Sequence, residues 1–357
     1  MTSPLSWRIR RSLGTAESFA SYLLGFVLLA GLVASGHSAP RADAPVVPVI
    51  DLHVDLSYQV NYKGKPFDMG SGQFQASWLR AAGVMGVVLP LFVPHEGSST
   101  GPTAPDLEAS YAKVLAGLAH HAPFRFPGCQ GVGQQGVATW LALEGAAPLA
   151  DDDKSALRWV ARGVRVFGLV HRAHNRLAAS STDPRKAWGL TSEGRALVEQ
   201  IHRAGGIVDV SHADDATVDQ VVSLALRDGV PVVASHSNAR AVWPHARNLD
   251  DERLRRIAAT GGLVGINFHA PYLNGTRHAE LADVVRHLEH ARRVAGIDHI
   301  GIGSDFEGGI AAPPELRDAR GYQRLARALM ARGWSRGAVE KAFSTNARRV
   351  LCGGNMR

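Results

Sequence analysis

Eight short apolar runs rich in β-branched residues recur along the chain, and segments with the apolar spacing of helices lie between them. The runs cover residues 46–55, 83–93, 139–145, 163–171, 205–212, 231–237, 261–269 and 299–306. The later helical segments end at glycines, namely Gly205, Gly229, Gly261 and Gly296. Strands that alternate with helices favour parallel β/α units, and eight such units predict an α/β fold of the (β/α)8 TIM-barrel type. A doubly wound open sheet is the alternative.

The N-terminal residues differ in character from the rest. Residues 1–18 are basic and polar, residues 19–34 are apolar and uncharged, and small and polar residues follow. This is the order of regions in a secretory signal, although the apolar part is slightly short for a full membrane span of about 20 residues. We expect residues 1–45 to be a signal peptide or membrane anchor with a short linker. The protein would then be exported, and be periplasmic, extracellular or held at a membrane.

Residues 46–357 contain no repeat and no second linker, which favours a single barrel domain. The formal net charge is +7, but no block of Lys and Arg lies in this part, so we expect no nucleic-acid partner. The only two cysteines, Cys129 and Cys352, lack the spacing of a thiolate metal site. Whether they pair, and whether the protein forms a homodimer, is left open by the sequence.

Ionisable residues gather at the ends of the apolar runs. The first run carries His53 and Asp55, which at positions i and i+2 of a strand would point to the same side. The ends of later runs carry Glu144, His171, His212, His236 and Asp305. In a parallel barrel the carboxyl ends of all strands surround one mouth, where such barrels hold their active sites. We therefore expect these seven side chains to lie close together.

Each of these residues alone has an ordinary explanation, such as a helix cap or a hydrogen-bonded core histidine. Together they would bury several charges near one another, and buried charges are normally paired or bound to a cation. Imidazoles with carboxylates and no thiolate suit zinc, with manganese, cobalt or iron as alternatives. A carboxylate between two metals roughly 3.5–4 Å apart would leave room for a shared hydroxide. The pattern predicts a two-metal hydrolase.

Several motifs resemble those of the membrane (renal-type) dipeptidase family of zinc metallopeptidases. They are "DLHVDL", "LALEGA", "GVRVFGLVHRAHN", "GGIVDVSH", "VVASHSNARAVWPHARNLDDE" and "HIGIGSDFEGG", in this order. The similarity runs from about residue 48 to the end of the chain. It implies an enzyme that binds two Zn²⁺ per chain and hydrolyses dipeptides with a free C-terminal carboxylate by a metal-bridging hydroxide. A D-residue at the C-terminal position is compatible with this scheme.

The resemblance also implies the metal ligands. His53 and Asp55 would hold one zinc, His212 and His236 the other, and Glu144 would bridge the two. Every position of the family's ligand pattern is filled.

Three further residues receive roles from the resemblance. Asp305 matches the acid/base that takes a proton from the bridging water, and His171 matches the histidine that contacts substrate and steadies the oxyanion. Arg247 matches an arginine near the substrate carboxylate, whereas taken alone it would be read as a surface ion pair with Asp250 or Asp251.

Two departures from the family pattern leave the substrate preference open. Glu307 stands where many relatives have aspartate, and residues 61–84 differ from the sequence that is usual in the family. The alternatives to a dipeptidase are a related amidohydrolase acting on a lactam or lactone, or a non-catalytic exported binding protein.

Overall fold

The computed structural model describes residues 45–68, 70–94, 101–121, 123–132 and 135–353, and these residues belong to one compact unit. The expected signal or anchor in residues 1–45 lies outside the described residues except for Pro45. Among the helices of the described ranges, none has the length and apolar character needed to cross a bilayer.

Eight parallel strands form a closed ring, as the sequence predicted. Their order around the ring is β1-β2-β4-β5-β6-β7-β8-β9, and β9 pairs with β1 to close it. This closure excludes the open sheet. The strands are β1 (Val49–Asp51), β2 (Val84–Phe92), β4 (Val137–Glu144), β5 (Val164–Gly168), β6 (Ile207–Asp209), β7 (Val232–Ala234), β8 (Leu263–Ile266) and β9 (Ile300–Ile302). A two-residue strand, β3 (Phe124–Arg125), pairs with the start of β4 and was not predicted.

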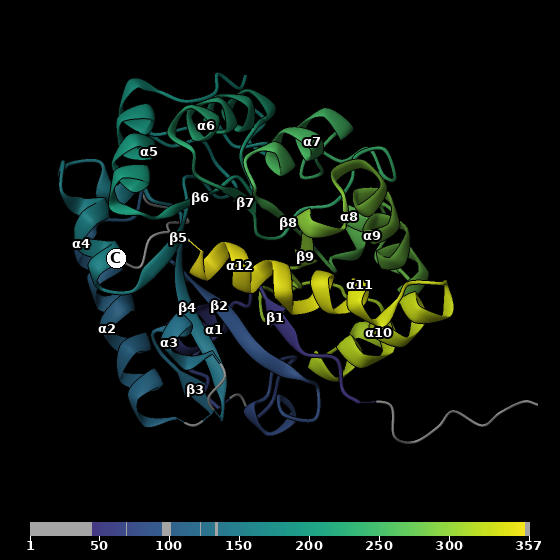
Figure 1. Cartoon of the computed structure of the whole chain (residues 1–357). Helices are drawn as coiled ribbons and strands as arrows, with labels where there is room; N and C mark the ends of the chain where they lie inside the picture. Colours follow the sequence, from purple (N-terminus) through teal and green to yellow (C-terminus); the bar gives the residue numbers. More distant parts are fainter. Residues whose placement is uncertain (1–44, 69, 95–100, 122, 133–134, 354–357) are drawn as a thin grey trace, which may run out of the picture. The chain divides into compact units, whose positions relative to one another are not determined.

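Helices surround the ring of strands (Figure 1). They are α1 (Leu56–Tyr62), α2 (Ala104–His120), α3 (Gly128–Gly131), α4 (Ser155–Ala161), α5 (Ser192–Ala204), α6 (Asp215–Asp228), α7 (Asp251–Ala259), α8 (Ala270–Leu273), α9 (Leu281–Ala295), α10 (Tyr322–Ala331), α11 (Arg336–Glu340) and α12 (Asn346–Cys352), with a π-helical turn at Lys341–Thr345. Short 3₁₀ turns lie at Ala76–Trp78, Ala147–Leu149, Ile297–His299, Pro314–Leu316 and Ala319–Gly321. As predicted, Gly205 and Gly229 end α5 and α6 in the left-handed conformation, with φ of 80° and 66°.

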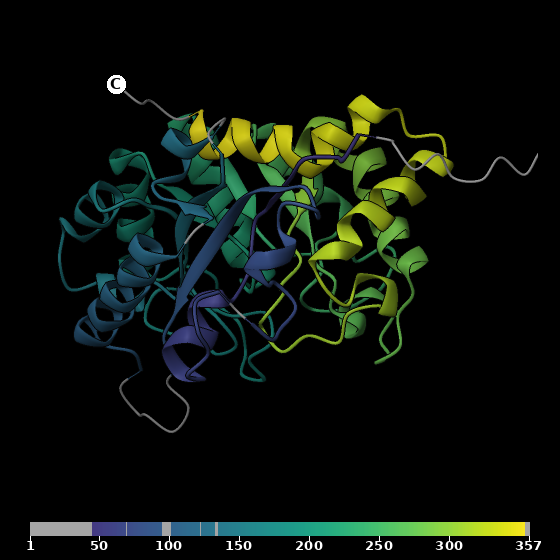
Figure 2. The ribbon, with the colours of Figure 1, turned by 90° about the horizontal axis from the view of Figure 1, so that it is seen from below.

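The interior of the barrel is filled by apolar side chains and closed at one end by α12. Inward-facing residues such as Leu52, Trp140 and Leu263 form one cluster with Val350 and Leu351 of α12. Figure 2 shows α12 lying across one end of the ring, while α1, which directly follows the first strand, lies at the other. Since α12 covers the end at which the strands begin, the opposite, carboxyl ends are left to form the site.

A disulfide links Cys352, the last residue of α12, to Cys129 in α3. The two residues are 223 positions apart in the sequence. Of the described residues, no cysteine is free. The bridge therefore fastens the helix that closes the barrel to the segment between β3 and β4.

We predict that Cys352→Ser lowers the thermal midpoint of the metal-free protein, corresponding to a loss of about 2–4 kcal/mol, because the unfolded chain then loses a long-range cross-link. Differential scanning calorimetry provides the measurement. Reductant should shift the wild-type midpoint by a similar amount and leave the variant where it is. A wild-type midpoint that does not respond to reduction would contradict the prediction.

Candidate metal centre

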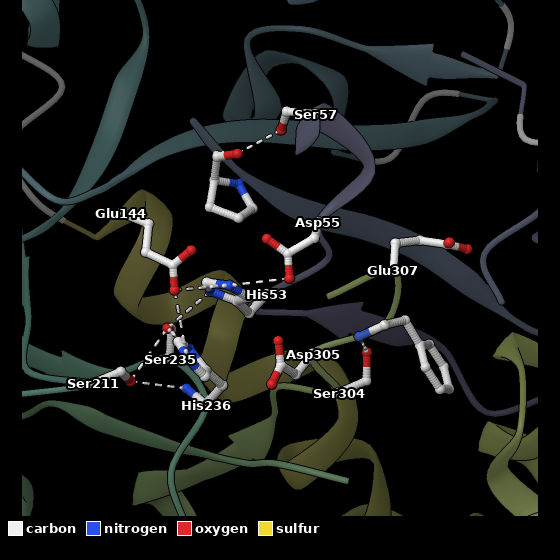
Figure 3. A network of polar contacts seen from close by, with 12 residues as sticks. His53, Asp55, Ser57, Glu144, Ser211, Ser235, His236, Ser304, Asp305 and Glu307 are labelled. Atoms are coloured by element: carbon white, nitrogen blue, oxygen red, sulfur yellow. Dashed lines mark hydrogen bonds and ion pairs between the residues drawn. The ribbon is translucent and has the colours of Figure 1, made fainter. Parts of the chain in front are cut away.

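The ionisable residues singled out in the sequence lie at or just beyond the carboxyl ends of strands. Glu144 is the last residue of β4, His171 follows β5, His212 follows β6, His236 follows β7 and Asp305 follows β9. Figure 3 shows the side chains of Glu144, His236 and Asp305 converging with those of His53 and Asp55, with the carboxylates of Glu144 and Asp305 turned toward the histidines. The prediction that strand ends bring these groups together is confirmed in its geometry.

The prediction that His53 and Asp55 lie on the first strand was wrong. Strand β1 ends at Asp51, so both residues lie in the turn before α1 rather than on the strand itself. The turn is held because the Asp51 carboxylate accepts a hydrogen bond from the His53 N–H at 3.0 Å, and Val54 forms an isolated parallel bridge with Phe306. The two side chains nevertheless meet, with His53 Nε2 at 3.7 Å from Asp55 Oδ2.

Two groups of possible ligand atoms share one carboxylate oxygen. In the first, Glu144 Oε1 lies 3.6 Å from His53 Nε2, which also faces Asp55. In the second, the same oxygen lies 3.1 Å from His212 Nε2 and 3.7 Å from His236 Nε2. The Nε2 atoms of His212 and His236 are 2.9 Å apart. Glu144 thus stands between a His-Asp pair and a His-His pair.

These separations fit metal coordination. Ligands bound to one ion at about 2.0–2.2 Å in a tetrahedral arrangement are about 3.4 Å from each other. The buried Nε2 of His53 has no hydrogen-bond partner, although two carboxylates lie nearby. Buried polar atoms are otherwise almost always satisfied. The residues present therefore suit a cation on either side of Glu144.

Burial and crowding of like charges shift the pKa values of the cluster in the metal-free protein. Burial, with a smaller contribution from the Asp55 carboxylate, raises the pKa of Glu144 to about 8 although His53 opposes the rise. Burial and Asp55 likewise raise the pKa of Asp305 to about 7. For His53, burial disfavours the charged ring, but Glu144 and Asp55 outweigh it and raise the pKa to about 10. A proton on His53 occupies the direction in which a metal would be bound.

Behind the histidines, one serine hydroxyl contacts two of the rings. Ser235 Oγ lies 2.5 Å from Asp209 Oδ2, 2.8 Å from His236 Nδ1 and 3.3 Å from His53 Nδ1. The hydroxyl has one hydrogen and a carboxylate oxygen only accepts, so Ser235 donates to Asp209 and accepts from ring N–H groups. Both histidines then carry their hydrogen on Nδ1 and turn Nε2 toward the cluster.

A cavity of about 490 Å³ lies over this cluster, and both remaining predicted residues line it. The His171 ring packs between Phe92 and His212 in tilted arrangements, at centroid distances of 4.5 and 4.4 Å, and its Nε2 is 3.9 Å from Glu144 Oε1. Arg247 also lines the cavity, although it is only 4% exposed. All eight residues selected from the sequence are therefore parts of one site.

The surface ion pair considered for Arg247 is absent. Asp250 pairs with Arg253, and Asp251 pairs with His290 at 2.6 Å. Arg247 has no acidic partner in the described part of the chain, and its buried Nε has no hydrogen-bond partner there. A buried guanidinium without a counter-ion, at the wall of a cavity, is suited to binding an anion.

Comparison with known proteins identifies the family to which the chain belongs. The family model described as "Membrane dipeptidase (Peptidase family M19)" matches residues 44–353. The chain belongs to this family. It is thus a hydrolase of the metallopeptidase class, as the motifs had indicated.

Several known proteins are similar to much of the chain. Dipeptidase aclJ from Aspergillus oryzae is 33% identical over 65% of this chain, and dipeptidase tcpJ from Claviceps purpurea is 35% identical over 60%. The matches span about half of each fungal protein, 53% and 50%. A metallopeptidase from Rhodobacter sphaeroides, solved with a phosphinate mimic of the dipeptide L-Ala-D-Ala, superimposes with a TM-score of 0.76 at 26% identity. That match covers 86% of this chain and 99% of the other.

Several supporting residues were missed in the sequence. Asp51 and Asp209 each end a strand and accept the backbone N–H two residues on, which fixes the turns that carry His53 and His212. The sequence signal that could have revealed these two aspartates is that each lies shortly before a histidine of the predicted site. Asn267 was also missed, and its amide donates to Asp305 Oδ2 at 3.0 Å.

Glu307, noted as a departure from the family pattern, points away from the metal cluster (Figure 3). Its carboxylate accepts hydrogen bonds from the N–H groups of Gln73 and Phe74, at 2.5 and 2.6 Å. These two residues belong to the other departing segment, residues 61–84. The two departures from the membrane dipeptidase pattern therefore contact each other, and Glu307 fastens that segment beside the site.

We predict that metal binding to the metal-free protein at pH 7 releases protons, because the raised pKa values of His53 and Glu144 mean that a metal must displace protons already held there. Metal affinity should then rise with pH, by about tenfold per unit for each proton displaced. Calorimetric titration in two buffers of different ionisation enthalpy measures the release. Identical apparent enthalpies in both buffers would contradict it.

We also predict that Ser235→Ala weakens metal binding by about 10- to 100-fold, because two rings lose the acceptor that fixes their Nδ1 hydrogens. A chelator competition assay on the purified protein gives the affinity. Ser237→Ala is the matched control, since Ser237 is also buried but its hydroxyl contacts only Ser211, at 3.5 Å. Equal affinities for the two variants would count against the role of Ser235.

Proposed function

We propose that the protein is a binuclear metal-dependent dipeptidase, with zinc as the expected metal, that cleaves dipeptides carrying a free C-terminal carboxylate. The observation that carries the proposal is Glu144 Oε1, which belongs to two ligand groups at once beneath a cavity that also holds the unpaired Arg247. Membership in the membrane dipeptidase family supports the same activity. The dipeptide mimic in the Rhodobacter sphaeroides relative supports tolerance of a C-terminal D-residue.

In this proposal His53 and Asp55 hold one metal, His212 and His236 hold the second, and Glu144 bridges them. When bound, such a metal pair polarises the carbonyl under attack and lowers the pKa of water. The chain holds these ligands in place through Ser235, whose contacts orient one ring of each pair. Other divalent metals with imidazole affinity remain compatible with the same ligands.

Asp305 is proposed to move the proton. Its carboxylate lies beside the cluster and lines the cavity, where it would face both the attacking water and the leaving amine. The amide of Asn267 donates to Oδ2 at 3.0 Å and fixes the direction of the carboxylate. We assign to Asp305 the transfer of a proton from the attacking water to the leaving amine.

His171 and Arg247 are proposed to hold the substrate. The His171 ring packs against Phe92 in a tilted arrangement and lines the cavity beside Glu144, which suits a hydrogen bond to the oxygen of the tetrahedral intermediate. The Arg247 guanidinium can bind the α-carboxylate by donating two parallel hydrogen bonds. With the scissile carbonyl at the metal cluster and the α-carboxylate at Arg247, the proposal places one substrate residue between them.

We further propose that the enzyme acts outside the cytoplasm. The order of basic, apolar and small-residue regions in residues 1–45 supports export. The Cys129–Cys352 bridge supports it independently, since stable disulfides are typical of oxidising compartments.

We predict that Asp305→Asn lowers kcat by about 10²–10⁴, because an amide cannot accept the proton of the attacking water. Metal analysis should find two ions per chain in both the wild type and the variant. That measurement is needed because Asp305 also lies within ligand distance of His53 and His236. A variant that retains near-normal kcat would assign the proton transfer to another group, whereas loss of a metal would make Asp305 a ligand.

We predict that the wild type cleaves Gly-Ala but cleaves its C-terminal amide poorly, because the amide cannot pair with Arg247. Arg247→Ala should lower kcat/KM for the acid by about 30-fold or more and remove most of the difference between acid and amide. Arg255→Ala, an exposed arginine of α7, is the control and should keep the difference. Equal cleavage of acid and amide by the wild type would favour a lactam- or lactone-type amidohydrolase instead.

A further inference from the structure

The loop that follows β5 carries three arginines, and one of them lacks a counter-ion. Arg176 pairs with Glu193 at 2.6 Å, and Arg185 pairs with Asp183 at 2.6 Å. The guanidinium of Arg172 has no ion pair and no hydrogen bond within the ranges that the structure describes. The other two arginines of this loop thus pair with acids, whereas Arg172 has no acidic partner among the described residues.

Arg172 directly follows His171 and lines the same cavity as Arg247. Its backbone is held in place, because its carbonyl accepts from Thr182 Oγ1 at 3.1 Å and the preceding carbonyl accepts from Ser180 Oγ at 2.6 Å. The side chain itself is exposed. A fixed Cα with a long, charged and unpaired side chain at the wall of an active-site cavity is suited to contact substrate.

His269 lies within the electrostatic reach of both arginines. Burial, followed by the charges of Arg172 and then Arg247, lowers the pKa of His269 to about 4, so its ring is neutral. Its Nδ1 accepts from the Ala311 N–H at 3.1 Å, and the hydrogen therefore sits on Nε2. Arg172, His269 and Arg247 together form what we call the donor wall of the cavity.

The donor wall has more hydrogen-bond donors than a single carboxylate can use. A carboxylate pairs with one guanidinium through two parallel hydrogen bonds, which would occupy Arg247 and leave Arg172 without a partner. The acidic residues that line the cavity, Asp55, Glu144 and Asp305, belong to the metal cluster. A second anion is therefore expected from the substrate.

Resting on the proposed dipeptidase function, we propose that Arg172 selects dipeptides whose C-terminal residue is aspartate or glutamate. The side chain of that residue branches from the same Cα as the α-carboxylate held by Arg247. Since Arg172 and Arg247 line the same cavity, the second carboxylate would lie on the side of the flexible Arg172 side chain. The N-terminal residue, on the far side of the scissile carbonyl, points away from the donor wall.

The test compares kcat/KM for Gly-Asp and Gly-Asn, which have nearly the same shape but differ in charge, using the metal-loaded enzyme. We expect the wild type to prefer Gly-Asp by about tenfold, the range of a hydrogen bond to a charged group. Arg172→Gln should bring the ratio close to one, mainly through KM. Arg172→Glu should reverse it and favour Gly-Lys over Gly-Asp.

Arg348→Gln is the matched control, because Arg348 is an exposed arginine of α12 at the opposite end of the barrel and its loss changes the net charge equally. It should keep the wild-type ratio. Gly-Ala is a separate substrate that tests the dipeptidase function itself. If Gly-Ala is hydrolysed but Gly-Asp and Gly-Asn are cleaved at equal rates, the role of Arg172 is overturned and the dipeptidase function stands. A preference for Asp-Gly over Asn-Gly that Arg172→Gln does not change would also overturn it. Absence of any dipeptide hydrolysis would refute both.

Discussion

A cluster of three carboxylates, two of them buried, imposes the main constraint on this molecule. Asp55 and Glu144 are buried, Asp305 is half-buried, and all three meet at the carboxyl ends of the strands, where removal from bulk water disfavours their charged forms. In the metal-free protein, burial, with a smaller contribution from mutual repulsion, raises the pKa values of Glu144 and Asp305, and the nearby carboxylates keep the ring of His53 charged. A bound cation offsets both effects and leaves the carboxylates ionised. The requirement for a metal thus follows from how the barrel packs its strand ends together.

The scaffold holds these groups by backbone geometry as much as by packing. His212 and Asp305 have φ values of 70° and 66°, which residues other than glycine rarely adopt. Hydrogen bonds compensate for the strain, since the His212 carbonyl accepts from the Ser181 N–H at 2.8 Å and the Asp305 N–H donates to the His53 carbonyl at 3.1 Å. Strained non-glycine residues tend to occur at functional sites, where the surrounding structure fixes them. Of the three non-glycine residues with positive φ in the described part of the chain, His212 is a candidate ligand, Asp305 is the candidate acid/base, and Glu307 fastens the segment that contains Gln73 and Phe74 beside the site.

The sequence predicted the barrel because each strand is an apolar run of the right length with a polar end, and it predicted the site because those ends meet in any parallel barrel. It failed where the signal depends on register or on long-range contacts. Strand β3 has only two residues and no periodicity, and the pairing of Cys129 with Cys352 depends on where α12 lies. Ser235 sits beside two rings only because β1, β6 and β7 are in a particular register, and serine is too common to be noticed by itself. For Arg247 the family resemblance indicated a role at the substrate carboxylate, whereas the residue taken alone left a surface ion pair open, and only the structure could show that Asp250 pairs with Arg253 instead.

The position of α12 has a consequence for how the chain reaches its native state. The last helix supplies Ala347, Val350 and Leu351 to the cluster that fills the barrel interior, while the first strand, β1, must pair with the last, β9. During synthesis the barrel therefore cannot be completed until its final residues have left the ribosomal exit tunnel. A nascent chain of this kind stays incompletely folded until α12 has emerged, and an incompletely folded chain can pass through a narrow translocation channel. The position of α12 thus delays completion of the barrel until Asn346–Cys352 is available.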